Sequence, residues 1–218
     1  MITLALDSAT DFCSAALQVD RQTRVREGAV PRRHAAVVVP WIRELLAQAG
    51  IGFSALDALA VTRGPGGFTS LRIGLGVMQG IALAHDLPIH PVSTLAALAE
   101  AADPHRRARR LLAVLDARMG EVYAGWYRTD GRTRRLIGRE AVISPRALSP
   151  PDEGPWLVVG SGLKVGPTAI SDALGVGLGA VRPESHPHAR ALLALAGEVE
   201  AVDAGHLQPV YLRDRVTG

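Results

Sequence analysis

The sequence contains one cysteine, few aromatic residues and no long hydrophobic run. The lone cysteine, Cys13, excludes an internal disulfide bond and any metal site made of several cysteines. No apolar stretch is long enough to span a membrane, and the first residues lack the charged start and apolar run of a signal peptide. We therefore expect a soluble, cytoplasmic protein with no membrane partner.

Lysine is almost absent as well, because Lys164 is the one lysine among 24 basic residues, and the formal net charge is +3. The arginines lie in bunches at 21–26, 32–33, 106–110 and 132–135. Since the planar guanidinium group pairs well with phosphate, such bunches are candidates for RNA contact. Taken alone, each bunch is better explained as a solvated surface loop that carries arginine.

Apolar residues make up 48% of the 218 residues, which is enough for a buried core in one large or two small domains. Hydrophobic patterning predicts strands at 2–7, 13–19, 23–29, within 55–64, at 87–93, in a hairpin over 111–128, at 134–144 and at 156–162. Helices are expected over 34–50, about 70–85, 93–102 and 186–202. The order of elements indicates an α/β fold in two halves, each opening with a strand hairpin.

The Pro- and Arg-rich stretch DPHRRARR, residues 103–110, is the best candidate domain boundary. We therefore predict an N-terminal lobe of residues 1–102 and a smaller C-terminal α/β lobe of residues 103–218. The segments LALDSAT and LAVLDARMG both place an aspartate at the end of a first hairpin strand. This is a hint of an internal repeat.

The glycine-rich segment TRGPGGFTSLRIG, residues 62–74, resembles a phosphate-binding loop only superficially. It lacks the lysine of a P-loop, and Thr69 occupies the third glycine position of a dinucleotide-binding fingerprint. A turn that opens a helix is the better interpretation, with glycines for the turn and the Thr69 hydroxyl as helix cap. The helix that follows carries a single charge over 71–84 and is apolar nearly all round, so every side of it should be covered by its own core or by a partner.

Several blocks of the sequence together resemble the TsaB (YeaZ) family. They are ALDSAT, RRHAAVVVPWIRELLAQAG, LDALAVTRGPGGFTSLRIGLGVMQGIALAHDLPIHPVSTLAALA, LDARMGEVYAGWY and the terminal PVYLRD. The resemblance runs from residue 2 to about residue 214. It implies a two-lobed actin-like fold, of the ASKHA or ribonuclease-H-like kind, with mixed sheets flanked by helices. It also implies an accessory role in making threonylcarbamoyladenosine beside the tRNA anticodon.

The resemblance further implies particular partners. This chain would bind its paralogue TsaD, which carries the metal and transfers the threonylcarbamoyl group, and would meet the small ATPase TsaE through the complex. Contact with tRNA would be indirect. We expect the partner surface on the helices at 34–49 and 70–85, near Val38, Trp41, Ile42, Leu45, Leu75, Gly76, Met78, Gln79 and Gly80. Without TsaD the same surface is expected to form a homodimer.

Residue chemistry agrees with a chain that has no catalytic residues of its own. The turns that would hold phosphate in an actin-like ATPase lack the needed glycine after Asp7 and carry bulky residues after Asp116. We interpret them as remnants of a nucleotide site, comprising Asp7, Ser8, Thr10, Asp116, Gly160 and Gly162. No histidine pair has H-x-x-x-H spacing, so no metal site is expected. No cofactor is expected either, apart from a nucleotide at the partner interface.

Two alternatives stay open at this stage. One is a nucleotide-dependent hydrolase or transferase with an active site between the lobes, at Asp7, Asp116 and Gly160. The other is direct RNA contact through arginines of the 106–110 and 132–135 bunches, above all Arg106, Arg107, Arg109 and Arg110.

Overall fold

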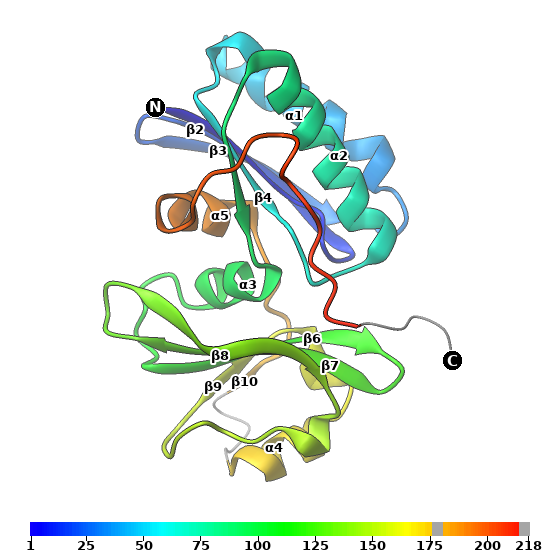
Figure 1. Ribbon diagram of the computed structural model, residues 1–218, viewed down its shortest axis with the longest axis vertical. Coiled ribbons are helices and arrows are strands. Elements are labelled where there is room, and N and C mark those ends of the chain that lie inside the picture. The colour runs from blue at the N-terminus through cyan, green and yellow to red at the C-terminus, as the bar shows by residue number, and fades with distance from the viewer. Residues whose placement is uncertain (176–180, 214–218) are drawn as a thin grey trace. The chain divides into compact units, whose positions relative to one another are not determined.

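The computed structural model describes residues 1–175 and 181–213 (Figure 1). The chain divides into two compact units. Unit 1 comprises Met1–Ala97 and Pro187–Val210, and unit 2 comprises Leu98–His186 and the terminal segment from Tyr211. No helix in the described ranges is both long and apolar enough to cross a bilayer.

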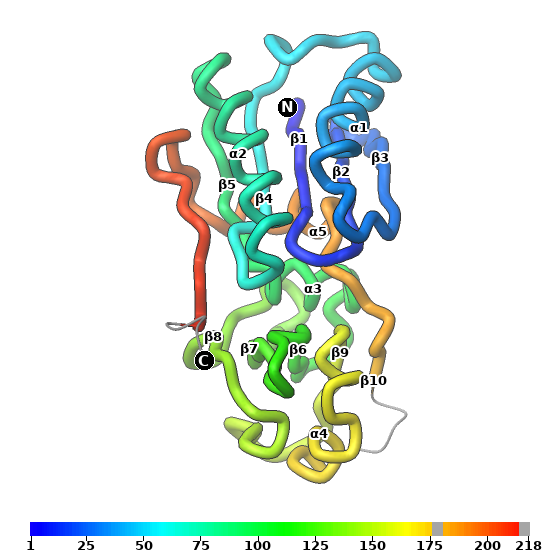
Figure 2. The backbone as a smooth tube through the Cα atoms, turned by 90° about the vertical axis from the view of Figure 1, so that its right-hand side faces the viewer, coloured from blue at the N-terminus to red at the C-terminus, as the bar shows by residue number. Residues whose placement is uncertain are grey.

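Unit 1 contains a mixed five-stranded sheet. Its strands are β1 (Ile2–Asp7), β2 (Phe12–Val19), β3 (Gln22–Ala29), β4 (Ala58–Thr62) and β5 (Ile89–Val92). They lie in the order β3-β2-β1-β4-β5, which Figure 2 shows from right to left. The β1–β2 and β2–β3 pairs are antiparallel, whereas β4 runs parallel to both β1 and β5. The expected hairpin at the start of the chain is therefore confirmed.

Helices cover both faces of the unit 1 sheet (Figure 1). On one face lie α1 (His34–Ala49) and α2 (Phe68–His85). Helix α1 buries Val38, Ile42 and Leu45 at helical spacing in a core that includes leucines of β1 and β2. On the other face lies α5 (Ala189–Leu195), which packs on alanines of β1, β2 and β4. A short 3₁₀ turn, Phe53–Ala55, precedes β4.

Unit 2 repeats the topology of unit 1. Its strands are β6 (Arg110–Arg118), β7 (Glu121–Thr129), β8 (Arg134–Ile143), β9 (Leu157–Val159) and β10 (Val181–Arg182), in the order β8-β7-β6-β9-β10. Two antiparallel pairs are again followed by two parallel pairs. The internal repeat that the two aspartate-ended strands hinted at is thus present in the topology, and the predicted α/β class with mixed sheets is confirmed.

The core of unit 2 lies between its sheet and α4 (Pro167–Leu174), where Trp156 packs edge-on against Trp126 with ring centroids 4.7 Å apart. Short 3₁₀ turns occupy Pro145–Ala147 and Ser161–Lys164. The sequence did not indicate α4 or β10, because α4 is eight residues long and β10 only two.

The expected lobe boundaries, 1–102 and 103–218, need correction in two places. The division falls at residues 97 and 98, inside α3 (Thr94–Ala102), and residues 187–210 return to unit 1. The reason is packing: Leu192 and Leu195 of α5 are buried with Ala5, Ala16 and Ala60 of the unit 1 strands. The helix expected over 186–202 is also shorter, because α5 gives way to a 3₁₀ turn at Ala196–Glu198.

Candidate partner surface and remnant nucleotide turns

Asp7 ends β1 and is completely buried. Its Oδ1 accepts hydrogen bonds from the Thr62 hydroxyl (2.9 Å) and from the Ala9 amide (3.2 Å), whereas its Oδ2 has no hydrogen-bond partner among the described residues. Burial raises the pKa of Asp7 to about 6, although the bonds from Thr62 and Ala9 oppose the shift. In this conformation the Asp7 carboxyl group is therefore inaccessible to solvent and to a ligand bound at the surface.

The loop of residues 64–67, which we call the glycine loop, covers the turn of residues 8–11 that follows Asp7 and that we call the first turn. The Gly67 amide donates to the Ala9 carbonyl (2.8 Å), and a Cβ at Gly66 would overlap Ala9. About two helical turns further on, a Cβ at Gly74 would overlap the Ser8 hydroxyl, which itself donates to the Ser70 carbonyl (2.9 Å). These glycines thus allow the loop and α2 to pack directly on the turn that follows Asp7.

Two details of the expected turn differ in the structure. The helix begins at Phe68 with Gly67 at the cap and no side-chain cap bond, so the prediction that Thr69 caps it was wrong. Thr69 already lies within the first helical turn, where its hydroxyl cannot act as N-cap.

Thr10 lies in the turn between β1 and β2. It donates its hydroxyl to the Phe12 carbonyl, and its own carbonyl lies 2.8 Å from His34 Nε2 at the start of α1.

The equivalent turn of unit 2 is more open. The side chain of Asp116 is 33% exposed, and it accepts from the Arg118 amide (2.7 Å) and pairs with the Arg118 guanidinium (3.3 Å). The Asp116 amide lies 3.3 Å from the Ser161 hydroxyl. Cβ atoms at Gly160 and Gly162 would both overlap Val114 of β6, so close packing on that strand accounts for the two glycines. An adenosine-binding role is not needed to explain them.

Two further residues that could carry chemistry, Cys13 and His188, have structural roles in unit 1. Cys13 is buried in β2, and burial, with the nearby charge of Asp7, raises the pKa of its thiol to about 12. His188 caps α5 by accepting from the Arg190 amide (3.0 Å). The described part of the chain holds no group of three or more side chains placed to bind a metal ion.

The expected partner residues divide into two sets. Five are buried in the core of unit 1, and one of them, Ile42, also borders the groove between α1 and α2: Val38, Ile42, Leu45, Leu75 and Met78. Gly76 and Gly80 are exposed, Trp41 is half-buried, and half-buried Gln79 donates to the carbonyls of Ala204 and Leu207. The candidate surface therefore narrows to the side of α2 that carries the exposed Gly76 and Gly80 and faces away from the core of unit 1.

That side of α2, with the neighbouring side of α1, forms an open apolar groove of about 330 Å³. It is lined by Val39, Ile42, Arg43, Phe53, Gly76, Val77, Gly80, Ile81, Ala84 and His85. Leu83, on the same side of α2 as Gly76 and Gly80, is 80% exposed. A Cβ at Gly76 or at Gly80 would have no atom within 4 Å, so both glycines lie open to an approaching helix. We define this groove with Leu83 as the α1–α2 face.

Sequence reasoning missed Val39, Val77, Ile81 and Leu83. Their spacing along the two helices was visible, but an apolar helix does not reveal which of its stripes faces the sheet and which faces outward.

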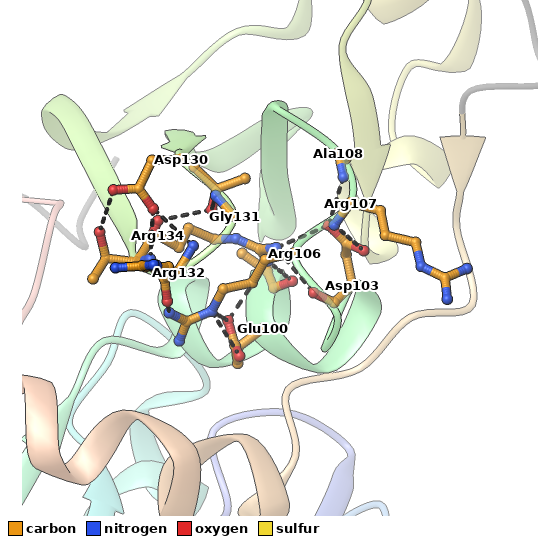
Figure 3. A network of polar contacts seen from close by, with 12 residues as sticks. Glu100, Asp103, Arg106, Arg107, Ala108, Asp130, Gly131, Arg132 and Arg134 are labelled. Atoms are coloured by element: carbon orange, nitrogen blue, oxygen red, sulfur yellow. Dashed lines mark hydrogen bonds and ion pairs between the residues drawn. The ribbon is translucent and has the colours of Figure 1, made fainter.

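The arginines of the 106–110 bunch also divide. Arg106 pairs with Glu100 and Arg110 with Asp152, whereas Arg107 and Arg109 are exposed. Arg134, from the 132–135 bunch, is buried and donates to Asp103 (Figure 3).

Known proteins resemble this chain over most of its length. A family model described as TsaD, tRNA N6-adenosine threonylcarbamoyltransferase, matches residues 14–178. The tRNA threonylcarbamoyladenosine biosynthesis protein TsaB of Escherichia coli (strain K12) is 37% identical, over 99% of this chain and 96% of that protein. The protein of the same name from Haemophilus influenzae is 36% identical, over 98% and 94%.

Among solved structures, YeaZ from Pseudomonas aeruginosa superposes with a TM-score of 0.88 at 39% identity, covering 97% of this chain and 99% of that one. The resemblance drawn from the sequence blocks, and the actin-like fold class that it implied, are thus confirmed. Over nearly its whole length the chain belongs to the TsaB (YeaZ) family.

Proposed function

We propose that this chain acts in tRNA threonylcarbamoyladenosine biosynthesis as a non-catalytic subunit that binds a TsaD-type transferase through the α1–α2 face. The pathway is the one named for relatives that align with nearly the whole chain. On this proposal the chain works in the cytoplasm, where tRNA is, and the ATPase TsaE meets it only through the complex. The chain itself needs no cofactor.

The observation that carries the proposal is the apolar surface beside two uncovered glycines. Gly76 and Gly80 lie one turn apart in α2 with open space above them, and Val77 and Ile81 flank them in the groove. Small residues one turn apart let a second helix backbone come close, and contiguous exposed apolar surface on a soluble protein marks an interaction site. A transferase that belongs to the same family model would offer helices of comparable kind.

The non-catalytic part of the proposal is supported by the two remnant turns, each considered within its own unit. Asp7 is buried under the glycine loop, and Asp116 is engaged by Arg118. A nucleotide-bound metal would need an accessible carboxylate, and the buried Asp7 does not offer one in this conformation.

The test uses Gly80→Arg, with binding to the TsaD-type transferase measured by calorimetry and by co-purification. Because the position is open and arginine favours helix more than glycine does, the variant should fold normally. An unpaired charge buried in the interface should weaken binding about 100-fold, which corresponds to ~3 kcal/mol. Gln48→Arg is the matched control: it adds the same charge at an exposed position on the opposite side of α1 from Val39, and should bind normally.

Binding of Gly80→Arg that equals wild type would sink the proposal for this face. The same variant also tests whether the homodimer expected without the transferase uses this face, because that homodimer should then dissociate in parallel. The expected functional result is that tRNA is modified only when the transferase is added to this chain, and that Gly80→Arg lowers the rate in proportion to its weaker binding.

The alternative of a nucleotide-dependent hydrolase or transferase has less support, because Asp7 would have to leave its buried position to act. Calorimetry with ATP and Mg²⁺ on the isolated chain tests it. Micromolar binding, with turnover that is lost in Asp7→Ala and retained in the groove variant Gly80→Arg, would favour the enzyme over the subunit.

A further inference from the structure

We propose that four exposed arginines at one end of the unit 2 sheet bind the phosphate backbone of the tRNA substrate. We call this set the arginine ridge; its members are Arg107, Arg109, Arg132 and Arg135. The inference rests on the proposed function, because that function supplies the RNA. It replaces the expectation that tRNA contact is indirect with a direct contact at named residues.

Backbone pairing brings the ridge together. The Thr129 amide donates to the Arg109 carbonyl (3.0 Å), which joins the start of β6 to the end of β7. Arg135 lies on β8, across from that same end of β7. The Arg106 guanidinium donates to the Arg132 carbonyl, so the loop before β6 lies against the β7–β8 turn. Two segments that are far apart in the sequence therefore present their arginines at one end of one sheet.

The structure separates arginines that serve the fold from those that do not. Among the arginines of residues 103–110 and 128–135, four have guanidinium groups paired with carboxylates, namely Arg106, Arg110, Arg128 and Arg134. The four ridge side chains are exposed and form no hydrogen bond or ion pair with other described residues. Figure 3 shows the Arg107 side chain extending away from the network that its neighbours make.

Positive charge is in excess at this end of the sheet. Residues 103–110 and 128–135 together hold eight arginines. Within the described ranges, the carboxylates that contact these two segments are those of Glu100, Asp103, Asp130 and Asp152. Exposed charge of one sign on a face of a protein attracts a polyanion and is released from counterions when the polyanion binds.

The carboxylates of Asp103 and Asp130 accept hydrogen bonds from backbone amides of the two loops and do not pair with the guanidinium groups of the ridge. Asp103 accepts from the amides of Arg107 (3.1 Å) and Ala108 (2.9 Å), and Asp130 accepts from the amides of Arg132 (2.7 Å) and Thr133 (2.8 Å). These bonds order both loops before any ligand arrives, so that binding needs to immobilise only the arginine side chains.

Phosphate is the ligand that this chemistry fits best. Each guanidinium offers a planar fork of donors that matches phosphate oxygens, and an all-arginine set provides no apolar centre of the kind that protein interfaces use. Leu136 is 40% exposed beside the ridge, which is too little apolar surface for such a centre.

The experiment measures binding of an unmodified tRNA transcript to the assembled complex of this chain and the TsaD-type transferase, over a series of salt concentrations. All four ridge arginines are changed to alanine. We expect binding to weaken about 10- to 100-fold at ~0.1 M salt, and the slope of log affinity against log salt to fall by roughly 3. A second variant with lysine at all four positions should recover most of the slope but only part of the affinity, because lysine keeps the charge and loses the fork.

The matched control removes four unit 1 arginines, so that the net charge changes equally: Arg21, Arg24, Arg33 and Arg190. It should bind tRNA nearly as well as wild type. Equal weakening by both quadruple variants, or none by the ridge variant, would overturn the proposal. Loss of binding to the transferase in place of tRNA would overturn it too, since the ridge would then be a protein contact.

Co-purification with the transferase reports on the proposed function independently of RNA. If wild-type chain does not bind the transferase, the same variants are measured on the isolated chain, where the ridge still predicts salt-dependent tRNA binding that the control variant retains. Isolated-chain binding that is indifferent to the ridge variant would then reject the ridge itself.

Discussion

Units 1 and 2 share one strand order, yet the aspartate that ends the first strand of each has a different environment. Asp7 is completely buried beneath the glycine loop and α2, whereas the Asp116 side chain is one-third exposed and pairs with Arg118 across an open hairpin turn. The difference arises from the connections between strands. Unit 1 places α1 between β3 and β4 and α2 between β4 and β5, while unit 2 has no long helix between β8 and β9 in the described chain. The two sheets thus share one topology, whereas the segments that connect their strands determine whether the aspartate at the end of the first strand is buried or exposed.

The two units also differ in how they bury charge. Unit 2 holds Arg134 in a network with Glu100 and Asp103, so that each buried charge has an opposite partner. Unit 1 buries Asp7 with hydrogen bonds to neutral groups only. When an ion pair is buried, removing one partner is costly because the other charge is left alone. When a single carboxyl group is buried without a charged partner, ionising it is costly. The predictions below test these contrasts in order of expected size.

The largest effect is expected from Arg134→Met. The substitution keeps side-chain bulk but leaves Asp103 and Glu100 buried without their shared guanidinium, and it also removes the bond to the Asp103 carbonyl (2.9 Å). We expect the free energy of unfolding to fall by about 3–5 kcal/mol, measured by denaturant titration.

The unit 1 comparison for this variant is Arg26→Met, which breaks the exposed Arg26–Glu44 pair. It should change the free energy of unfolding little, because solvent screens that pair. Equal effects of the two substitutions would contradict the view that unit 2 depends on a buried network.

The next effect concerns pH and Asp7. Its pKa is raised from an ordinary 3.8 to about 6, so the folded chain holds a proton that the unfolded chain releases in this range. The stability contributed by that proton is fully present below about pH 3.8 and is lost as pH rises through about 6. The loss amounts to about 3 kcal/mol. Asp7→Asn removes this dependence and keeps an acceptor for Thr62 and Ala9.

Thermal or denaturant unfolding of wild type and Asp7→Asn from pH 4 to pH 7.5 measures the effect. The variant should gain stability relative to wild type as pH rises, whatever constant offset the amide introduces. Carboxyl groups whose pKa values are lowered, such as those of Asp130 and Asp203, act in the opposite direction in both proteins and cancel in the difference. A difference that stays flat over this range would rule out an ionisable buried Asp7, and Asp116→Asn serves as the comparison from unit 2.

A smaller loss is expected from Gly66→Ala. The added Cβ would overlap the backbone and side chain of Ala9, so the glycine loop must move off the first turn. We expect a loss of about 1–3 kcal/mol by denaturant titration. The unit 2 counterpart is Gly162→Ala, whose Cβ would overlap Val114; similar losses would indicate that glycine serves close packing in both copies.

Much of this fold could be predicted from the sequence, because its strands and longer helices carry clear apolar patterns. The end of α1 at Gly50 follows from a turn residue, and the strands of both hairpins follow from such apolar patterns. The membership of α5 in unit 1 could not be predicted, because it depends on which sheet offers a matching apolar face far away in the sequence.

The candidate sites divide in the same way. The sequence pointed to two helices as candidates for partner binding and to the arginine bunches, but Val38 and Met78 proved to be core, and Arg106 and Arg110 proved to be ion-paired. Composition identifies a residue type that is able to bind; contacts within the fold decide whether its side chain is available. The contacts of the partner surface and of the arginine ridge with their ligands stay predictions.

The smallest effect has the opposite sign to that of Gly66→Ala and makes the sharpest comparison between glycines ten residues apart. At Gly76 an added Cβ meets no atom within 4 Å, so Gly76→Ala should only gain helix propensity, and the isolated chain should be stabilised by about 0.5–1 kcal/mol. If a partner helix approaches this glycine closely, the same methyl group should weaken binding to the transferase by several-fold while it stabilises the chain. Denaturant titration and calorimetry on one protein sample measure both quantities. Stabilisation without any loss of affinity would mean that the helices meet elsewhere along the α1–α2 face, because a backbone in van der Waals contact with Gly76 has no space for a methyl group.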